Sequence, residues 1–172
     1  DRFNRQRHPE VFFAAMTQYD GDTQTPKHFL VSPPQTTDCL GELLCGAGIT
    51  QLACSETQKF GHVTYFWNGN NSNYINESLE TYIEIPSYNQ PFDEKPEMKA
   101  YEITEKTIKL LESGHYKFGR LNFPNGDMVG HTTNKEAIIK ACEVTDECVG
   151  KLIEVVSKLN GITVVLSDHG NA

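Results

Sequence analysis

The chain has 172 residues, 38% of them hydrophobic and 22% charged, which suits a soluble domain with a substantial core. Its formal net charge is −8 and its pI is about 5.2, so a basic face for nucleic acid is not expected. No apolar run approaches the ~20 residues that a membrane span needs, and the first residues carry no signal-peptide core. These features argue against nucleic-acid and membrane partners.

Cysteine usage indicates the redox compartment. Five cysteines are present, which is an odd number, and no Cys-x-x-Cys pair occurs among them. Reduced thiols explain this usage better than a disulfide framework or a zinc knuckle does. We therefore expect a cytoplasmic protein.

The start of the chain contains two short apolar runs. Residues 11–16 and 29–31 predict two strands. Pro33 and Pro34 end the second run, because consecutive prolines stiffen the backbone and remove hydrogen-bond donors. We place a domain boundary there, between residues 1–33 and 34–172. The first segment is too short to build a core of its own.

From residue 39 onward, helical and strand patterns alternate. Helices are predicted at residues 39–45, before Glu112 and at 134–159, and strands at 50–54, at 81–86, ending at Phe123 and at 162–166. The last of these runs is continuous and β-branched, which is typical of a strand buried on both faces. The alternation predicts an α/β fold with a mostly parallel sheet flanked by helices.

Two of the predicted helices carry an apolar stripe at three- and four-residue spacing. In the helix before Glu112, the predicted core face is Tyr101, Thr104, Ile108 and Leu111. In the longest helix it is Ala137, Ala141, Val144, Cys148, Leu152, Val155 and Leu159.

Residues 122–131 contain the first candidate site, in a predicted glycine-containing loop between a strand and the longest helix. Asp127 and His131 could bind a divalent ion there, although such residues alone are more often a turn residue and a surface histidine. Asp168 and His169 follow the next predicted strand, so both pairs are expected at the same carboxyl edge of the sheet. Together they favour a two-metal site for phosphoryl transfer over two plain turns.

Lys59 lies in a second polar segment directly after a predicted strand. Its ammonium could contact a phosphate or a developing negative charge, but a loop lysine is more often a solvated surface residue. His62, in the same segment, is either a hydrogen-bond donor or a packed histidine. Neither a Gly-x-Ser-x-Gly elbow nor a P-loop occurs, so the residues identify no nucleophile.

Four segments resemble the cofactor-independent phosphoglycerate mutase family of the alkaline phosphatase superfamily. They are residues 13–21, 54–69, 122–131 and 168–172, in family order and at family-like spacing. The resemblance implies that residues 34–172 are part of an alkaline-phosphatase-like, metal-binding phosphatase domain. It implies that residues 1–33 are a C-terminal remnant of the transferase, or substrate-binding, domain with its linker.

Members of this family interconvert 3-phosphoglycerate and 2-phosphoglycerate through a phosphoserine at a two-metal site, in glycolysis and gluconeogenesis. The resemblance assigns Asp127 and His131 to one metal, and Asp168 and His169 to the other. It assigns Lys59 to the transferring phosphoryl group, as a catalytic and substrate-binding residue. The expected ions are manganese, with magnesium or cobalt as alternatives, and no 2,3-bisphosphoglycerate is required. We expect a monomer.

The sequence also departs from the family. The family's nucleophilic serine, an aspartate ligand and the substrate arginines belong to preceding segments, and a further histidine ligand follows residue 172. Thr133 stands where glycine is common. We therefore expect a C-terminal portion of such an enzyme, inactive by itself. The alternatives are a non-catalytic metal-binding or interaction module, and another phosphomutase or phosphatase of the superfamily; residues 56–69 favour the mutase.

Overall fold

The computed structural model describes residues 6–19, 23–32 and 36–172, which divide into two compact units, Asp1–Thr36 and Thr37–Ala172. The predicted boundary at residues 33 and 34 lies outside the described residues. The assignment of the two segments to two domains of a larger enzyme stays a prediction.

The first unit is a small parallel pair of strands. β1 (Ala15–Thr17) pairs with β2 (Phe29–Val31), with Ala15 opposite Phe29 and Thr17 opposite Val31. The prediction of β2 is confirmed, but the first strand was predicted too long, because β2 offers only three residues to pair with. None of the described residues of this unit is buried, and Phe12 is 82% exposed. The structure therefore agrees with the expectation that this segment is too short to build a core of its own.

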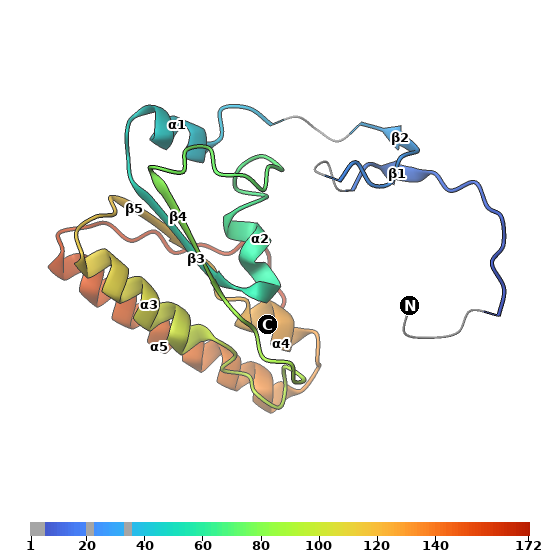
Figure 1. The fold of residues 1–172 in the computed structure, drawn as a ribbon. Helices are drawn as coiled ribbons and strands as arrows, with labels where there is room; N and C mark the ends of the chain where they lie inside the picture. Colours follow the sequence, from blue (N-terminus) through green and yellow to red (C-terminus); the bar gives the residue numbers. More distant parts are fainter. Residues whose placement is uncertain (1–5, 20–22, 33–35) are drawn as a thin grey trace. The chain divides into compact units, whose positions relative to one another are not determined.

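The second unit is built on a three-stranded parallel sheet in the order β4-β3-β5 (Figure 1). The strands are β3 (Gln51–Glu56), β4 (Glu80–Ile85) and β5 (Phe118–Leu121). Every residue of the central strand β3 is buried, as expected for a strand with a partner on each side and helices over the sheet. The predicted α/β fold with a parallel sheet is confirmed.

Two long helices lie side by side over one face of this sheet (Figure 1). They are α3 (Ala100–Glu112) and α5 (Lys135–Lys158), and the shorter α1 (Leu40–Gly46) precedes β3. In α5 the predicted stripe is buried from Ala137 to Leu152, whereas Leu159 is 46% exposed. In α3 the predicted core face was partly wrong, since Ile103 and Thr107 are buried in place of Ile108 and Leu111.

Short helices follow two of the strands. The turn η1 (Thr57–Lys59) and α2 (Phe60–Val63) follow β3, and α4 (Asn125–Gly130) follows β5. The prediction of an irregular loop at residues 122–131 was therefore wrong. The glycines there do not break the helix, and Gly130 makes room for the last segment, since a Cβ at Gly130 would lie 3.0 Å from the carbonyl oxygen of Asn171.

The last segment also differs from its prediction. Residues 161–172 form no strand, and Ile162 and Val164 are 91% and 76% exposed. A β-branched run forms a strand only where a neighbouring edge accepts its hydrogen bonds, and no described strand pairs with this one. The segment runs back along the molecule to the neighbourhood of α4 (Figure 1).

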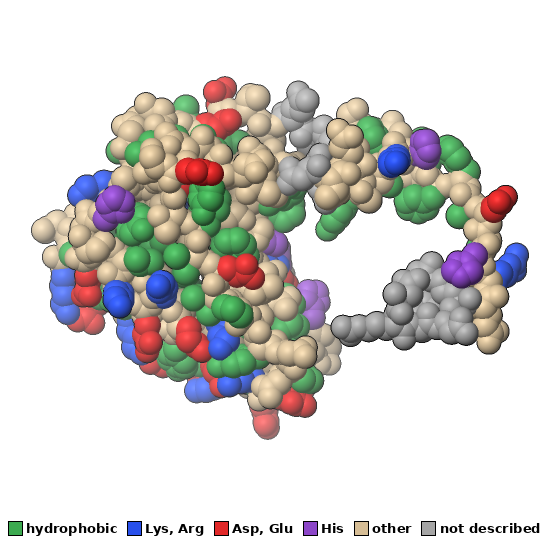
Figure 2. Space-filling model, viewed as in Figure 1, with side chains coloured by type: hydrophobic (Ala, Val, Ile, Leu, Met, Phe, Trp, Pro, Cys, Tyr) green, Lys and Arg blue, Asp and Glu red, His purple; other side chains and the backbone are tan. Residues whose placement is uncertain are grey.

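The surface over α3 and α5 carries lysines and acidic residues in alternation (Figure 2). Several of these residues form pairs one helical turn apart, such as Lys151 with Glu147 and Lys158 with Glu154. Within the described ranges, no helix is both long enough and apolar enough to cross a membrane.

Candidate metal centre

The first two site residues lie just after two neighbouring strands of the sheet. Lys59 ends η1, directly after β3, and Asp127 lies in the first turn of α4, which follows β5. Because β3 and β5 are parallel neighbours, both segments leave the sheet at its carboxyl edge. Residues 68 positions apart in the sequence thereby come into contact.

Asp127 is the centre of the contacts at this edge. The ammonium of Lys59 forms an ion pair with its Oδ2. The amide nitrogen Nδ2 of Asn171 donates to Oδ1 at 2.8 Å, and Nε2 of His131 lies 3.1 Å from the same oxygen. The hydrogen bond from Lys59, followed by that from Asn171 and the charges of Lys59 and His131, lowers the pKa of Asp127 to about 2 against the cost of burial. The carboxylate is thus held ionised among donors.

The second predicted pair is exposed at both residues, whereas in the first pair His131 is 70% exposed and Asp127 only 18%. Nε2 of His169 lies 3.5 Å from Oδ2 of Asp168, and the two side chains are 48% and 57% exposed. This pair lies in an extended segment instead of at the end of a strand, so the predicted route to the site was wrong. The segment reaches α4 nevertheless, because Asn171 hydrogen-bonds to Asp127 and fits against Gly130.

His62 lies within electrostatic reach of residues from both predicted pairs. Burial, followed by the charge of Lys59, lowers the pKa of His62, while the charges of Asp168 and Asp127 raise it and that of His169 lowers it slightly. The pKa of this imidazole is therefore affected by Lys59 and by residues of both predicted pairs. Its ring also packs edge-on against Phe66, with the ring centroids 5.2 Å apart. His62 is partly a packed histidine and partly a neighbour of the site.

The side chains at this edge are of the kinds that bind a divalent ion, but too few of them lie together to hold one. Carboxylate oxygen and imidazole nitrogen both bind such ions, and the 3.1 Å between Asp127 Oδ1 and His131 Nε2 is close to the ~3 Å between adjacent ligands at bond lengths of ~2.1 Å. Among the described residues, however, no three His, Cys, Asp or Glu side chains gather closely enough to hold an ion. Asp127 and His131 could therefore hold a metal together, with further ligands required.

A buried arginine hydrogen-bonds to the end of the helix that follows Lys59. Arg120 of β5 donates from Nε to the carbonyl oxygen of Val63 at 2.7 Å, and from Nη1 to Oε1 of Gln51 at 2.9 Å. Its Nη2 lies 3.5 Å from Oε1 of Glu80, and both side chains are almost fully buried. The guanidinium thereby fixes the end of α2, the helix that continues from Lys59.

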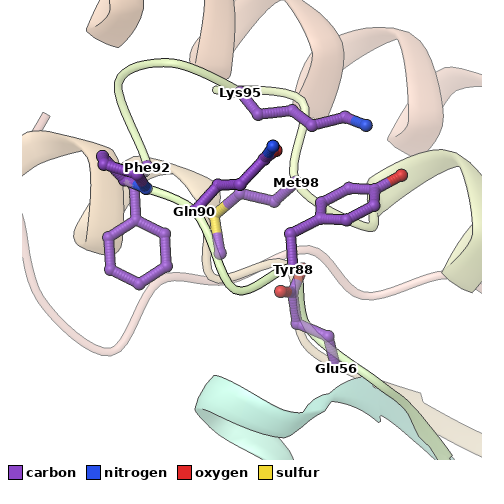
Figure 3. Close-up of a pocket in the computed structure, with 7 residues that line it drawn as sticks. Glu56, Tyr88, Gln90, Phe92, Lys95 and Met98 are labelled. Atoms are coloured by element: carbon purple, nitrogen blue, oxygen red, sulfur yellow. The ribbon is translucent and has the colours of Figure 1, made fainter.

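Glu56, the last residue of β3, also shapes this region. Its carboxylate accepts hydrogen bonds from the hydroxyl of Ser87 at 2.7 Å and from the backbone N–H of Lys99 at 2.9 Å. Burial raises the pKa of Glu56 more than these bonds lower it. Glu56 borders a small cavity with Tyr88 and Met98 (Figure 3). At about 10 Å³ this cavity holds one water molecule at most and is no substrate pocket.

Sequence reasoning missed three residues of this region. Asn171 carried a signal, because it lies two residues after the predicted ligand His169 and short polar side chains beside ligands often orient them. Glu56 and Arg120 carried none, since both are ordinary charged residues whose partners are distant in sequence. Only the fold brings Arg120 to Val63 and Gln51.

The family comparison covers nearly the whole chain. Residues 13–172 match the family described as the Metalloenzyme superfamily.

Among curated proteins, the chain is 51% identical to the 2,3-bisphosphoglycerate-independent phosphoglycerate mutase of Nicotiana tabacum and 49% identical to that of Trypanosoma brucei brucei. In each case the match covers 100% of this chain and 31% of the relative. The chain therefore spans about a third of the length of the curated relatives it matches.

A solved structure gives the same result. The phosphoglycerate mutase of Leishmania mexicana, determined at low cobalt concentration, superimposes with a TM-score of 0.90 and is 52% identical. The superposition covers 99% of this chain and 31% of that protein.

Proposed function

The chain belongs to the Metalloenzyme superfamily, and on that basis we propose that it is the C-terminal metal-binding part of a 2,3-bisphosphoglycerate-independent phosphoglycerate mutase. Such an isomerase interconverts 3-phosphoglycerate and 2-phosphoglycerate. The identity of about 50% to mutases over the full chain supports this proposal.

In this proposal each Asp-His pair serves one divalent ion. Asp127 and His131 bind the first ion, and Asp168 and His169 bind the second. Two such ions would neutralise charge on the oxygens of a phosphoryl group in transfer. Lys59 contacts that phosphoryl group through its ammonium, and a serine from another part of the whole protein carries it as a phosphoserine.

The observation that carries the proposal is the convergence on Asp127. Lys59, His131 and Asn171 come from three separate segments and all reach this carboxylate. An acidic group with a cation, an imidazole and an amide around it suits a site for metal and phosphate better than a structural turn does.

Further features of the proposal rest on the resemblance to the mutases, for the ions and the cofactor, and on composition, for the compartment and the partners. The ions are manganese, with magnesium or cobalt as alternatives, and no 2,3-bisphosphoglycerate takes part. A cytoplasmic monomer without a nucleic-acid partner agrees with the net charge of −8 and with the five free thiols in the structure.

The test uses the full-length protein that contains this chain, supplied with Mn²⁺. Phosphorus NMR follows 3-phosphoglycerate, because it separates 2-phosphoglycerate from free phosphate. We expect isomerisation in the wild type and a loss of at least about 100-fold in Asp127→Ala, by removal of a ligand. The control Glu154→Ala removes an exposed carboxylate that pairs with Lys158 and should keep full activity.

Three outcomes would contradict the proposal. Release of free phosphate without isomerisation would indicate a phosphatase of the same superfamily. Turnover by the 172-residue chain alone would show that no other part supplies the nucleophile. Metal binding without any turnover of the full-length protein would favour the non-catalytic alternative.

A further inference from the structure

The ion pair between Lys59 and Asp127 occupies the carboxylate that we assign to a metal. The ammonium of Lys59 lies on Oδ2, while Asn171 and His131 contact Oδ1. The two side chains of the ion pair are mostly buried, with 13% of Lys59 and 18% of Asp127 exposed. The negative charge of Asp127 is therefore already balanced by a cation of the protein itself.

A divalent ion at this site would compete with the ammonium for the charge of one carboxylate. An ion held by Oδ1 and by Nε2 of His131 would lie within a few ångströms of Nζ, which sits on the other oxygen of the same carboxylate, and two cations at that distance repel each other. The lysine side chain is suited to leave, since its head group is a point charge on a flexible four-carbon stem. Its backbone stays fixed, because α2 follows directly and Arg120 holds Val63.

We propose that Lys59 is an internal counter-ion that occupies Asp127 before a divalent ion binds and that the ion displaces it from this carboxylate. This proposal rests on the proposed function, because it takes Asp127 as a metal ligand. The displaced ammonium becomes available to a phosphomonoester dianion at the same edge of the sheet. Metal binding and anion binding are thereby coupled through one side chain.

The test measures metal binding, not turnover. The full-length protein is stripped with a chelator and titrated with Co²⁺ at fixed pH and salt, by calorimetry and by visible absorption. We expect Lys59→Met to bind Co²⁺ about tenfold more tightly, equivalent to the loss of one partly buried competing ion pair. The control Lys158→Met also removes one positive charge and one ion pair, with Glu154, and should bind Co²⁺ as the wild type does.

A second readout distinguishes displacement from simple repulsion. In the metal-free protein, Lys59→Met leaves Asp127 without its cation and should lower the melting temperature. With saturating Co²⁺ this difference should vanish, because the wild-type ammonium has already left the carboxylate. If the Met variant does not fold, Lys59→Gln provides the same comparison with a polar head group.

The outcomes separate the two proposals. The counter-ion proposal is overturned if Lys59→Met binds Co²⁺ as tightly as the wild type or more weakly, or if the difference in melting temperature persists in Co²⁺. Either result leaves the metal assignment intact. Co²⁺ binding by Asp127→Ala with wild-type affinity overturns the metal assignment and the counter-ion with it.

Discussion

Individual side chains at the carboxyl edge of the sheet are held in costly environments. Glu56 is 1% exposed and has a raised pKa, so its ionised form is disfavoured by the fold. Thr133, just after α4, has a backbone φ of +60°, in the left-handed region that β-branched residues rarely adopt. Both costs are local, and each can be removed by a single substitution.

Glu56 should make stability fall as pH rises. A group whose pKa is raised by folding stabilises the protein fully below its unfolded value, here 4.5, and this contribution is lost as pH rises through the folded value. Glu56→Gln resembles the protonated acid, because its oxygen can accept from Lys99 while its amide donates to Ser87. The melting temperature of Glu56→Gln relative to wild type should therefore increase between pH 4 and pH 7. A constant difference across this range would contradict the assignment.

Thr133→Gly should stabilise the protein. Glycine adopts a positive φ without steric cost, and the gain is roughly 0.5–1 kcal/mol after its greater freedom in the unfolded chain is subtracted. The control is Thr132→Gly, which should destabilise, because the Thr132 hydroxyl donates to the carbonyl oxygen of Val129 at 2.7 Å. Urea unfolding of the three proteins measures both effects.

At the scale of elements, the site depends on how short helices are fixed to the sheet and to the last segment. Arg120 connects β5 to the end of α2, and Gly130 of α4 lets Asn171 lie against that helix. Neither contact includes a proposed ligand atom. Each nevertheless decides where the ligands and Lys59 are held.

Arg120→Met should destabilise by about 3–5 kcal/mol, because it leaves the buried carboxylate of Glu80 without its cation. The double variant Arg120→Met, Glu80→Gln should recover part of this loss, since the unpaired charge is gone. Urea unfolding of the single and double variants gives the coupling. Equal losses in both would show that Arg120 acts only through Gln51 and Val63.

Gly130→Ala should detach the last segment from α4. Its Cβ would meet the carbonyl oxygen of Asn171 at 3.0 Å, and also the amide group of that residue. Hydrogen exchange of residues 167–172 should accelerate in this variant while α5 keeps its protection. Gly150→Ala is the matched control, because its Cβ meets nothing within 4 Å, and it should stabilise α5 by roughly 0.5–1 kcal/mol.

At the scale of the whole molecule, the sequence predicted what periodicity determines. The stripe of α5 and the parallel sheet follow from local patterns that the fold retains. The pairing of Lys59 with Asp127 could not be predicted, because it depends on which strands are neighbours. The strand at residues 162–166 was predicted wrongly for the same reason: a pattern indicates a tendency to pair, but the partner edge is a property of the fold.

The length of α5 sets a condition on the site. Its 24 residues extend about 36 Å at ~1.5 Å each, and the last segment must cover much of that distance in reverse to bring Asn171 to Asp127. Residues 159–171 reach about 43–47 Å when fully extended, at ~3.3–3.6 Å per residue. The segment must therefore run largely extended to make this contact, which agrees with its form without a neighbouring strand.

A segment that runs largely extended should tolerate insertion better than shortening. Deletion of Val164 and Val165 reduces the reach by about 7 Å and should separate Asn171 from Asp127. Insertion of two glycines after Gly161 only adds slack and should preserve that contact. Hydrogen exchange of residues 167–172 distinguishes the two variants, and equal protection in both would show that the segment has length to spare. The length of α5 thus sets the minimum length of the segment that runs back along it.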